Sequence, residues 1–354
     1  MENRYLRHFI IRTLIGAIPA ILLLAASFYY WFGIRPYISG DLGQLGKIPF
    51  DKEYNTSNYR PRLSRIMVFQ YTEGERATAV STIGDSFSQQ GPVGYQNYLG
   101  NLLGDTVCNI RLDPTLITPA QGTANLLAQG FFREHPEIKT LIIEDVEHEF
   151  VQRWQKIDFE GTSKESLILS PDPDAVAESP HTYQDIMTTI FRQGTDWIRL
   201  ALKVDRNPVY KVGLKSRLFT LPGHESDLYF YRDDLTPTEI TSEEKTRLLS
   251  NLREMKRRLA EQGVRMICFV VPDKLETYRP FLVEDNFKPR TTGDSLLSLD
   301  ISGVLVFPRD EVRNLVVSGE KDVFMGDDTH WSYKAASAAA RKLHERITEE
   351  SNIK

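Results

Sequence analysis

Two short motifs contain the residues whose types could do chemistry together. Gly84-Asp85-Ser86-Phe87 follows an apolar run, and Asp328-Thr329-His330-Trp331 stands far along the chain, just before the last predicted helix. Acyl-transfer and hydrolytic chemistry needs a serine nucleophile, a histidine that takes its proton and a carboxylate that orients the histidine. The chain supplies all three, in the order serine, aspartate, histidine.

Ser86 follows a predicted strand, residues 77–83, and precedes a loop and a helix. Sites in open α/β sheets form at the carboxyl ends of strands, where N–H groups near a helix start can stabilise an oxyanion. A turn that caps the next helix is the structural alternative. Gly293-Asp294-Ser295-Leu296 matches the Gly-Asp-Ser-Leu signature more literally, but a polar, proline-bearing segment precedes it, so we expect a helix N-cap there. Strand context therefore favours Ser86 over Ser295.

His330 is the best-placed histidine for the base. Asp328 and Asp327 stand two and three residues before it, and either carboxylate could reach the imidazole Nδ1 within a tight turn. Asp328 is the expected partner, with Asp327 as runner-up, and capping of the final helix is the alternative for both. Trp331 either walls the pocket or begins the core face of that helix.

The elements that must position these motifs alternate between strand and helix. Strands are expected at 77–83, 106–111, 139–145, 264–272 and 303–307, and helices at 95–103, 121–133, 183–202, 242–262 and 331–347. Such alternation predicts a parallel sheet covered by helices on both faces. Residues 76–354 are thus expected to form one α/β catalytic domain, with an insertion from about residue 150 to 235 that carries a hairpin.

The N-terminus predicts a membrane helix. The stretch from Thr13 to Ile34 has no charged residue, and at about 1.5 Å per residue it is long enough to cross a hydrocarbon core of about 30 Å. The preceding arginines place the N-terminus in the cytoplasm. We expect residues 1–36 to be a cytoplasmic stub and anchor and residues 37–75 a stalk. A cleaved signal peptide that ends near Ala25-Ala26-Ser27 is the alternative.

Composition limits the partners and cofactors. A net charge of −5 argues against a general nucleic-acid binder. Cys108 and Cys268 both lie in apolar runs, which favours buried free thiols over a disulfide, and neither has metal-ligand spacing. We expect no metal and no other cofactor.

The two opening motifs together resemble the SGNH (GDSL) hydrolase superfamily and, within it, the branch of bacterial alginate O-acetylation proteins. Val271-Pro272-Asp273-Lys274 resembles a strand-end segment of that branch, and Leu218-Phe219 with Tyr229-Phe230-Tyr231 resembles its hairpin. One departure concerns order. In the alginate proteins the Asp-His motif precedes the serine motif, whereas here the serine comes first, which implies either a circularly permuted relation or a separate branch.

The resemblance implies a three-layer α/β/α domain with Ser86, His330 and Asp328 as its triad. It also implies a single-pass protein of the bacterial inner membrane, with a periplasmic domain that transfers acyl groups, by default acetyl, to a cell-surface or exported polysaccharide. An MBOAT-type membrane acyltransferase is the implied acyl source. An esterase or deacetylase with the same triad, and a non-catalytic glycan-binding or assembly protein, are the alternatives.

Further site residues are less clearly indicated. The superfamily uses a glycine and an asparagine to bind the oxyanion, for which Gly122 and Asn125 are weak candidates; a loop glycine and a helix-face asparagine are the structural alternatives. Lys274 either binds an anionic sugar or acyl carrier or pairs with Asp273 in a surface loop.

Overall fold

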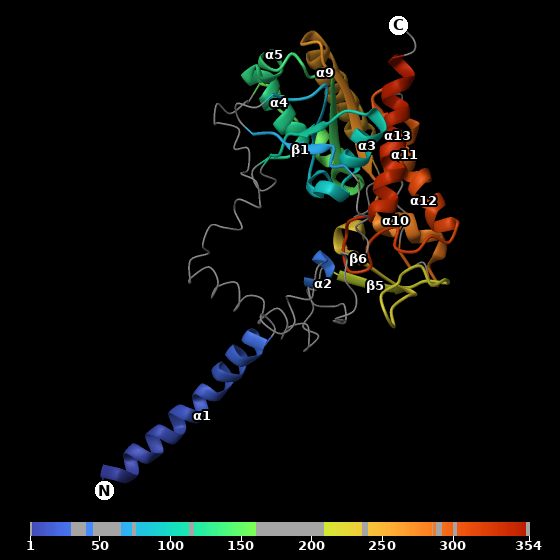
Figure 1. Cartoon of the computed structure of the whole chain (residues 1–354). Coiled ribbons are helices and arrows are strands. Elements are labelled where there is room, and N and C mark those ends of the chain that lie inside the picture. Colours follow the sequence, from blue (N-terminus) through green and yellow to red (C-terminus); the bar gives the residue numbers. More distant parts are fainter. Residues whose placement is uncertain are drawn as a thin grey trace.

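The structure is a computed structural model that describes residues 2–29, 40–44, 65–72, 76–112, 117–160, 209–235, 240–284, 286–287, 292–299 and 303–351. Six parallel strands form its main sheet, in the order β1-β3-β2-β4-β7-β8 (Figure 1). Their bounds are β1 Val68–Gln70, β2 Val80–Ile83, β3 Val107–Asn109, β4 Thr140–Val146, β7 Arg265–Val271 and β8 Leu305–Val306. The predicted α/β class with a parallel sheet is confirmed.

Buried apolar residues on both faces explain why these runs become central strands. In β4, Leu141 and Ile143 face one core while Ile142 faces the other, and β7 alternates in the same way. A strand buried on both sides reads as a continuous apolar run, which is the pattern of parallel sheets. β4 pairs with β7 over its whole length, from Thr140 opposite Arg265 to Val146 opposite Val271.

Helices cover both faces of the sheet and give a three-layer domain. One layer contains α4 Pro119–Gln129, α6 Glu147–Trp154 and α9 Ser242–Glu261; the other contains α3 Tyr95–Leu103, α12 Arg309–Val317 and α13 Tyr333–Ser351. The predicted helix at 242–262 is present as α9 and begins with a capping box between Thr241 and Glu244. Four buried alanines of α13, at positions 335, 336, 339 and 340, allow it to pack closely in its layer.

The shorter elements connect these layers. The helices among them are α2 Asp41–Gln44, α5 Phe131–Glu134, α10 Lys274–Tyr278 and α11 Thr292–Ser298. The 3-10 turns are η4 Ser86–Gln89, η5 Gly91–Val93, η6 Arg232–Leu235 and η7 Arg279–Phe281. The hairpin expected within the insertion is present as β5 Val209–Gly213 and β6 Asp227–Tyr231, whereas the helix expected at 183–202 lies outside the described residues.

Two described parts of the segment predicted as a stalk pack against the domain instead. β1 adds an edge strand beside β3, and α2 places Leu42 in a buried cluster with Val209, Leu221 and Tyr229. Each is only three or four residues long and too short to show an apolar period, so tertiary contacts rather than local preference determine their structure. Residues 45–64, between these two parts, lie outside the described residues.

Helix α1 spans Glu2–Tyr29 and contains residues 13–29 of the predicted membrane segment, whose remaining residues 30–34 lie outside the described residues. Its window Tyr5–Ala26 has a mean hydropathy of 2.2, and none of that window is buried within the structure (Figure 1). A membrane anchor and a signal sequence both fit such a helix by length and composition.

Gly100 of α3 allows the close approach between this helix and the chain entering β1. A Cβ at this position would lie 2.6 Å from the Met67 Cβ and 2.7 Å from the Met67 carbonyl oxygen. We predict that Gly100→Ala lowers the free energy of unfolding by about 1–3 kcal/mol, because overpacking outweighs the better helix propensity of alanine. Urea unfolding measures the change, and Leu102→Ala on the exposed side of α3 serves as the control. Equal stability of Gly100→Ala and the wild type would contradict the close packing.

Candidate active site

Ser86 stands at the carboxyl end of β2, as predicted. It is the first residue of η4 and is exposed, and the side chain of Asp85 caps the turn by accepting the Phe87 N–H at 3.2 Å. The helix after β2, α3, lies on one face of the sheet, and the helix after β4, α6, lies on the other. Between two such strands an open α/β sheet has its ligand crevice.

Glu144 of β4 holds the serine turn through two hydrogen bonds. Its Oε2 accepts the Asp85 N–H at 3.0 Å and the Ser88 hydroxyl at 2.8 Å. A Cβ on Gly84 would lie 2.1 Å from the Ser88 Oγ and 2.3 Å from the Glu144 Oε2. The glycine of the Gly-Asp-Ser motif is therefore required by the contact that fixes the turn.

Arg153 of α6 balances the acidic groups beneath the turn. Its guanidinium donates to the Asp85 Oδ2 at 3.1 Å and to the Asp145 Oδ1, and it also pairs with Glu149. Burial raises the pKa of Asp145 to about 7, against the opposing charge of Arg153. Burial, helped by the charge of Asp85, raises the pKa of Glu144 well above its usual range. Burial thus disfavours the charged form of Glu144, which limits the negative charge held beneath the turn.

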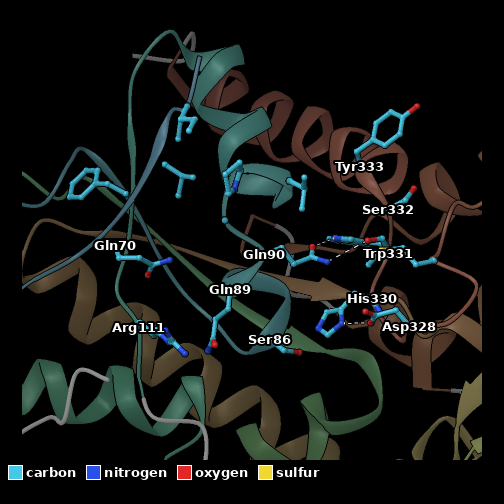
Figure 2. A pocket seen from close by; sticks show the side chains of 17 residues that line it. Gln70, Ser86, Gln89, Gln90, Arg111, Asp328, His330, Trp331, Ser332 and Tyr333 are labelled. Carbon is cyan, nitrogen blue, oxygen red and sulfur yellow. Dashed lines mark hydrogen bonds and ion pairs between the residues drawn. The ribbon is translucent and has the colours of Figure 1, made fainter. Parts of the chain in front are cut away.

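His330 and Asp328 form a hydrogen-bonded pair within one tight turn. The Asp328 Oδ1 lies 2.6 Å from the His330 Nδ1 and also accepts the His330 backbone N–H at 2.9 Å. This double contact fixes the ring. Figure 2 shows Ser86 beside the His330 ring on the wall of one cavity, with the ring's Nε2 side toward the serine and its Nδ1 side toward Asp328. The structure thus brings Ser86, His330 and Asp328 together.

The surroundings of this pair shift the pKa values of both of its members. Burial lowers the pKa of His330, but the hydrogen bond and charge of Asp328, with the charges of Asp41 and Asp85, outweigh burial and raise that pKa above its ordinary value. Burial raises the pKa of Asp328, but the hydrogen bond and charge of His330 outweigh burial and lower that pKa. Asp328 is therefore ionised where His330 titrates, as an orienting carboxylate must be.

Asp327, the runner-up carboxylate, points elsewhere. Its Oδ2 accepts the Gly40 N–H at 3.1 Å, and no hydrogen bond joins it to His330 among the described residues. Burial, followed by the charge of Asp328, raises the pKa of Asp327 to about 6. Asp328 is the carboxylate that contacts the imidazole.

Lys274 binds the backbone of the turn that carries Asp328 and His330. Its Nζ donates to the backbone carbonyls of Met325 at 2.7 Å and Asp328 at 2.8 Å, and the side chain is buried. Asp273 instead bonds the Nδ1 of His148, at 2.6 Å. Burial lowers the pKa of Lys274 to about 8 despite the nearby carboxylates. Lys274 is thus buried rather than in a surface loop, and its ammonium group supports the backbone of the histidine turn.

Trp331 links the two motifs. It is buried, its ring packs edge-on against Phe87 at 5.1 Å, and its Nε1 donates to the Gln90 Oε1 at 2.9 Å (Figure 2). Trp331 therefore both lines the cavity and joins the core. Gln90, which no sequence pattern singled out, ties the serine segment to the histidine turn.

The weaker candidates lie away from Ser86. Gly122 and Asn125 are on α4, where Gly122 faces the Leu112 side chain and Asn125 accepts from Gln121, and neither lines the cavities that Ser86 lines. Ser295 lies inside α11 rather than at its N-cap, and Asp294 is exposed and pairs with Arg309. The structure therefore does not bring Gly122, Asn125 or Ser295 to the site.

Ser86 borders two cavities. One, of about 550 Å³, has His330 and Trp331 on its wall; its polar lining includes Gln70, Ser86, Gln89, Gln90, Arg111, Asp328, His330 and Tyr333. The other, of about 340 Å³, is more acidic and is lined among others by Asp41, Asp85, Ser86, His148, Arg153, Asp233, Asp273, Lys274 and Thr329. A serine between two cavities can meet one reactant from each side.

Two groups in the described part of the chain have ligand atoms close enough to hold a cation. They are Asp41 with Asp328 and His330, and His148 with Asp234 and Asp273. In each group the imidazole Nδ1 is already within hydrogen-bond distance of a carboxylate. Cys108 and Cys268 are buried and form no disulfide with each other, as expected.

Comparison with known families agrees with this geometry. Residues 222–354 match the family model of the SGNH hydrolase-like domain of acetyltransferase AlgX. This part of the chain is similar to that domain. The AlgX-like segment contains Asp328, His330 and Lys274, and Ser86 lies outside it, in keeping with the serine-first order. Searches of curated proteins and of solved structures gave no match. The resemblance expected from the motifs is confirmed.

The network beneath Ser86 predicts different effects for two changes at Glu144. Glu144→Gln keeps an acceptor for Asp85 and Ser88, and since burial disfavours the charged form of Glu144 it should cost less than about 1 kcal/mol of stability. Glu144→Ala leaves buried donors unpaired beside a new cavity and should cost about 2–4 kcal/mol. Denaturant unfolding at neutral pH measures both. An equal loss for Gln and Ala would show that an ionised carboxylate is required.

Proposed function

We propose that the protein is a serine-dependent O-acyltransferase that modifies a polysaccharide outside the cytoplasm. The observation that carries this proposal is the 2.6 Å contact between the Asp328 Oδ1 and the His330 Nδ1, on a ring whose other nitrogen side faces the exposed Ser86. The AlgX-like segment supports an acetyl group as the transferred acyl group.

The mechanism has two half-reactions. His330 Nε2 takes the proton of the Ser86 hydroxyl as Oγ attacks the carbonyl carbon of an acyl ester donor, and the imidazolium then protonates the leaving alcohol. A sugar hydroxyl, deprotonated by the same nitrogen, attacks the acyl-enzyme and releases Ser86. Asp328 keeps the ring in the required tautomer and stabilises the imidazolium in both steps.

Two donors on the wall of the larger cavity are candidates for binding the oxyanion in place of Gly122 and Asn125. Gln89 Nε2 and Arg111 Nε are buried and lack a hydrogen-bond partner among the described residues. Unpaired buried donors cost stability, so their presence beside a nucleophile favours a functional role. Figure 2 shows both side chains on the same side of the cavity as Ser86.

The two cavities favour transfer over hydrolysis. A donor in one and an acceptor in the other would reach opposite sides of Ser86. With α1 as a membrane anchor and the arginines of its start in the cytoplasm, the domain would be periplasmic. An MBOAT-type membrane protein would then deliver the acyl group across the membrane. Carbohydrate ester hydrolysis by the same residues is the second candidate, since water can also resolve an acyl-enzyme.

Substitution of the nucleophile tests the triad. We expect Ser86→Ala to abolish acyl-adduct formation with an activated acetyl ester and to lower turnover by about 10⁴-fold or more. Mass spectrometry of the intact protein detects the adduct, and transfer to an acceptor glycan against release of free acetate separates transferase from esterase. Ser295→Ala is the matched control and should behave as the wild type. Normal adduct formation and transfer by Ser86→Ala would contradict Ser86 as the nucleophile, and their absence in the wild type would favour the non-catalytic, glycan-binding alternative.

The raised pKa of His330 predicts the pH profile. The base must be neutral, so kcat/KM for the donor should rise with pH and reach half its plateau above the ordinary histidine value of about 6.5. Asp328→Asn removes the carboxylate that raises this pKa. The midpoint should therefore move to lower pH while the plateau falls by about 10⁴-fold. A midpoint that does not move in Asp328→Asn would contradict the assigned pair.

A further inference from the structure

The short helix α2 lies against the histidine turn although it precedes that turn by most of the chain. The Gly40 N–H donates to the Asp327 Oδ2, and a Cβ on Gly40 would lie 2.1 Å from the Asp327 carbonyl oxygen. Only a glycine permits this backbone approach. Leu42, two residues on, is fully buried against Val209, Leu221 and Tyr229. The segment Gly40–Gln44 is thus fastened on both sides of Asp41.

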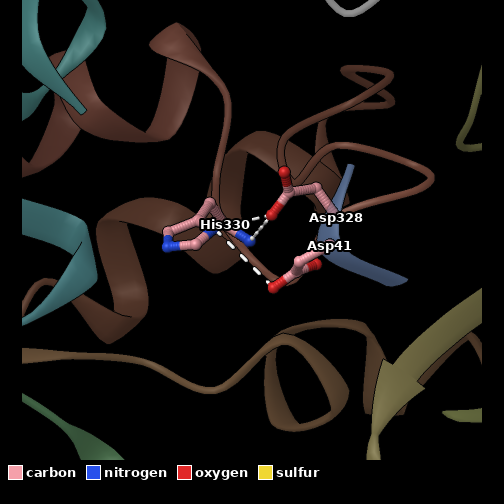
Figure 3. Close-up of side chains that lie close together, drawn as sticks. All are labelled: Asp41, Asp328 and His330. Atoms are coloured by element: carbon pink, nitrogen blue, oxygen red, sulfur yellow. Dashed lines mark hydrogen bonds and ion pairs between the residues drawn. The ribbon is translucent and has the colours of Figure 1, made fainter. Parts of the chain in front are cut away.

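Asp41 contacts Thr329, the residue between the two triad members. Its Oδ1 accepts the Thr329 N–H at 2.7 Å, and its Oδ2 accepts the Thr329 hydroxyl. The same Oδ2 lies 4.0 Å from the His330 Nδ1 (Figure 3). Asp328 already occupies the hydrogen-bonding position on that nitrogen. The Asp41 carboxylate therefore fixes the backbone of the turn and adds a second negative charge near the ring.

We propose that Asp41 is a positioning residue for His330, so that the segment following the apolar helix completes the active site. This rests on the triad of the proposed function. Lys274 holds the turn by its carbonyls from one side, and Asp41 holds its N–H and hydroxyl from another. With only residues 30–40 between α1 and α2, the part of the chain nearest the membrane supplies a component of the site.

The charged groups around His330 come from three elements. They are Asp328 of its own turn, Asp41 of α2 and Asp85 of the serine turn, and all three raise the pKa of His330. Burial, with the charge of Asp328, raises the pKa of Asp41 itself to about 6. Above that pH Asp41 is ionised and favours the imidazolium that forms during each half-reaction.

Three full-length variants test the proposal: Asp41→Ala, Asp41→Asn and, as control, Asp105→Asn at the exposed turn before β3. Loss of the Thr329 contacts should lower kcat of Asp41→Ala about 10- to 100-fold with little change in donor KM. Asp41→Asn, whose amide oxygen still accepts the Thr329 N–H, should lose less. Formate should restore part of the activity of Asp41→Ala and none to the control.

An activity-independent readout separates this inference from the proposed function. NMR titration of the imidazole should give a lower His330 pKa in both Asp41 variants and an unchanged one in Asp105→Asn. An unchanged His330 pKa together with wild-type kcat in Asp41→Ala would overturn the inference. A lowered pKa in Asp41→Ala, combined with full activity of Ser86→Ala, would instead overturn the proposed function and leave the positioning role intact. If Asp41→Ala does not fold, the same outcomes are scored on Asp41→Asn.

Discussion

The hydrogen bond between Asp328 and His330 is the contact on which the rest of the site depends. It spans only two residues, so its geometry is set by the backbone of the turn, and that backbone is held from outside. Lys274 binds its carbonyls, Asp41 binds Thr329, and Gln90 ties Trp331 to the serine segment. A change in any of these contacts would shift the backbone of the turn and, with it, the position of the imidazole.

This arrangement buries several charged groups, which is energetically unfavourable. Several acidic side chains gather at the carboxyl end of the sheet, namely Asp41, Asp85, Asp145, Asp327 and Asp328. Burial raises the pKa of three of them, Asp41, Asp145 and Asp327. Lys274 and Arg153 offset part of that charge. Pairs of titratable groups whose surroundings move their pKa values apart are a mark of functional sites. Asp328 and Asp327 are such a pair, because the first is held ionised by His330 and the second is not.

The sequence predicted the parallel sheet and singled out Ser86, Asp328 and His330, which line one cavity, because both depend on local pattern. The apolar run of β7 and the strand before Ser86 can be recognised from their own residues. The tight Asp-Thr-His turn can be recognised in the same way. The sequence did not predict the roles of Asp41, Gln90 or Lys274. Each depends on a contact between distant segments, and no residue spacing records that contact. The proposal of Gly122 and Asn125 as oxyanion donors also depended on contacts between distant segments. A position on a helix does not show which part of the fold a side chain faces.

A structure of the protein after reaction with a fluorophosphonate would test the central assignment most directly. The phosphorus should be bonded to the Ser86 Oγ. The His330 Nε2 should lie within hydrogen-bond reach of that oxygen, at about 2.6–3.2 Å, with the bond from Nδ1 to Asp328 intact. Phosphorus on another residue such as Ser295, or an imidazole turned away from a labelled Ser86, would contradict the triad and the acyl-enzyme built on it.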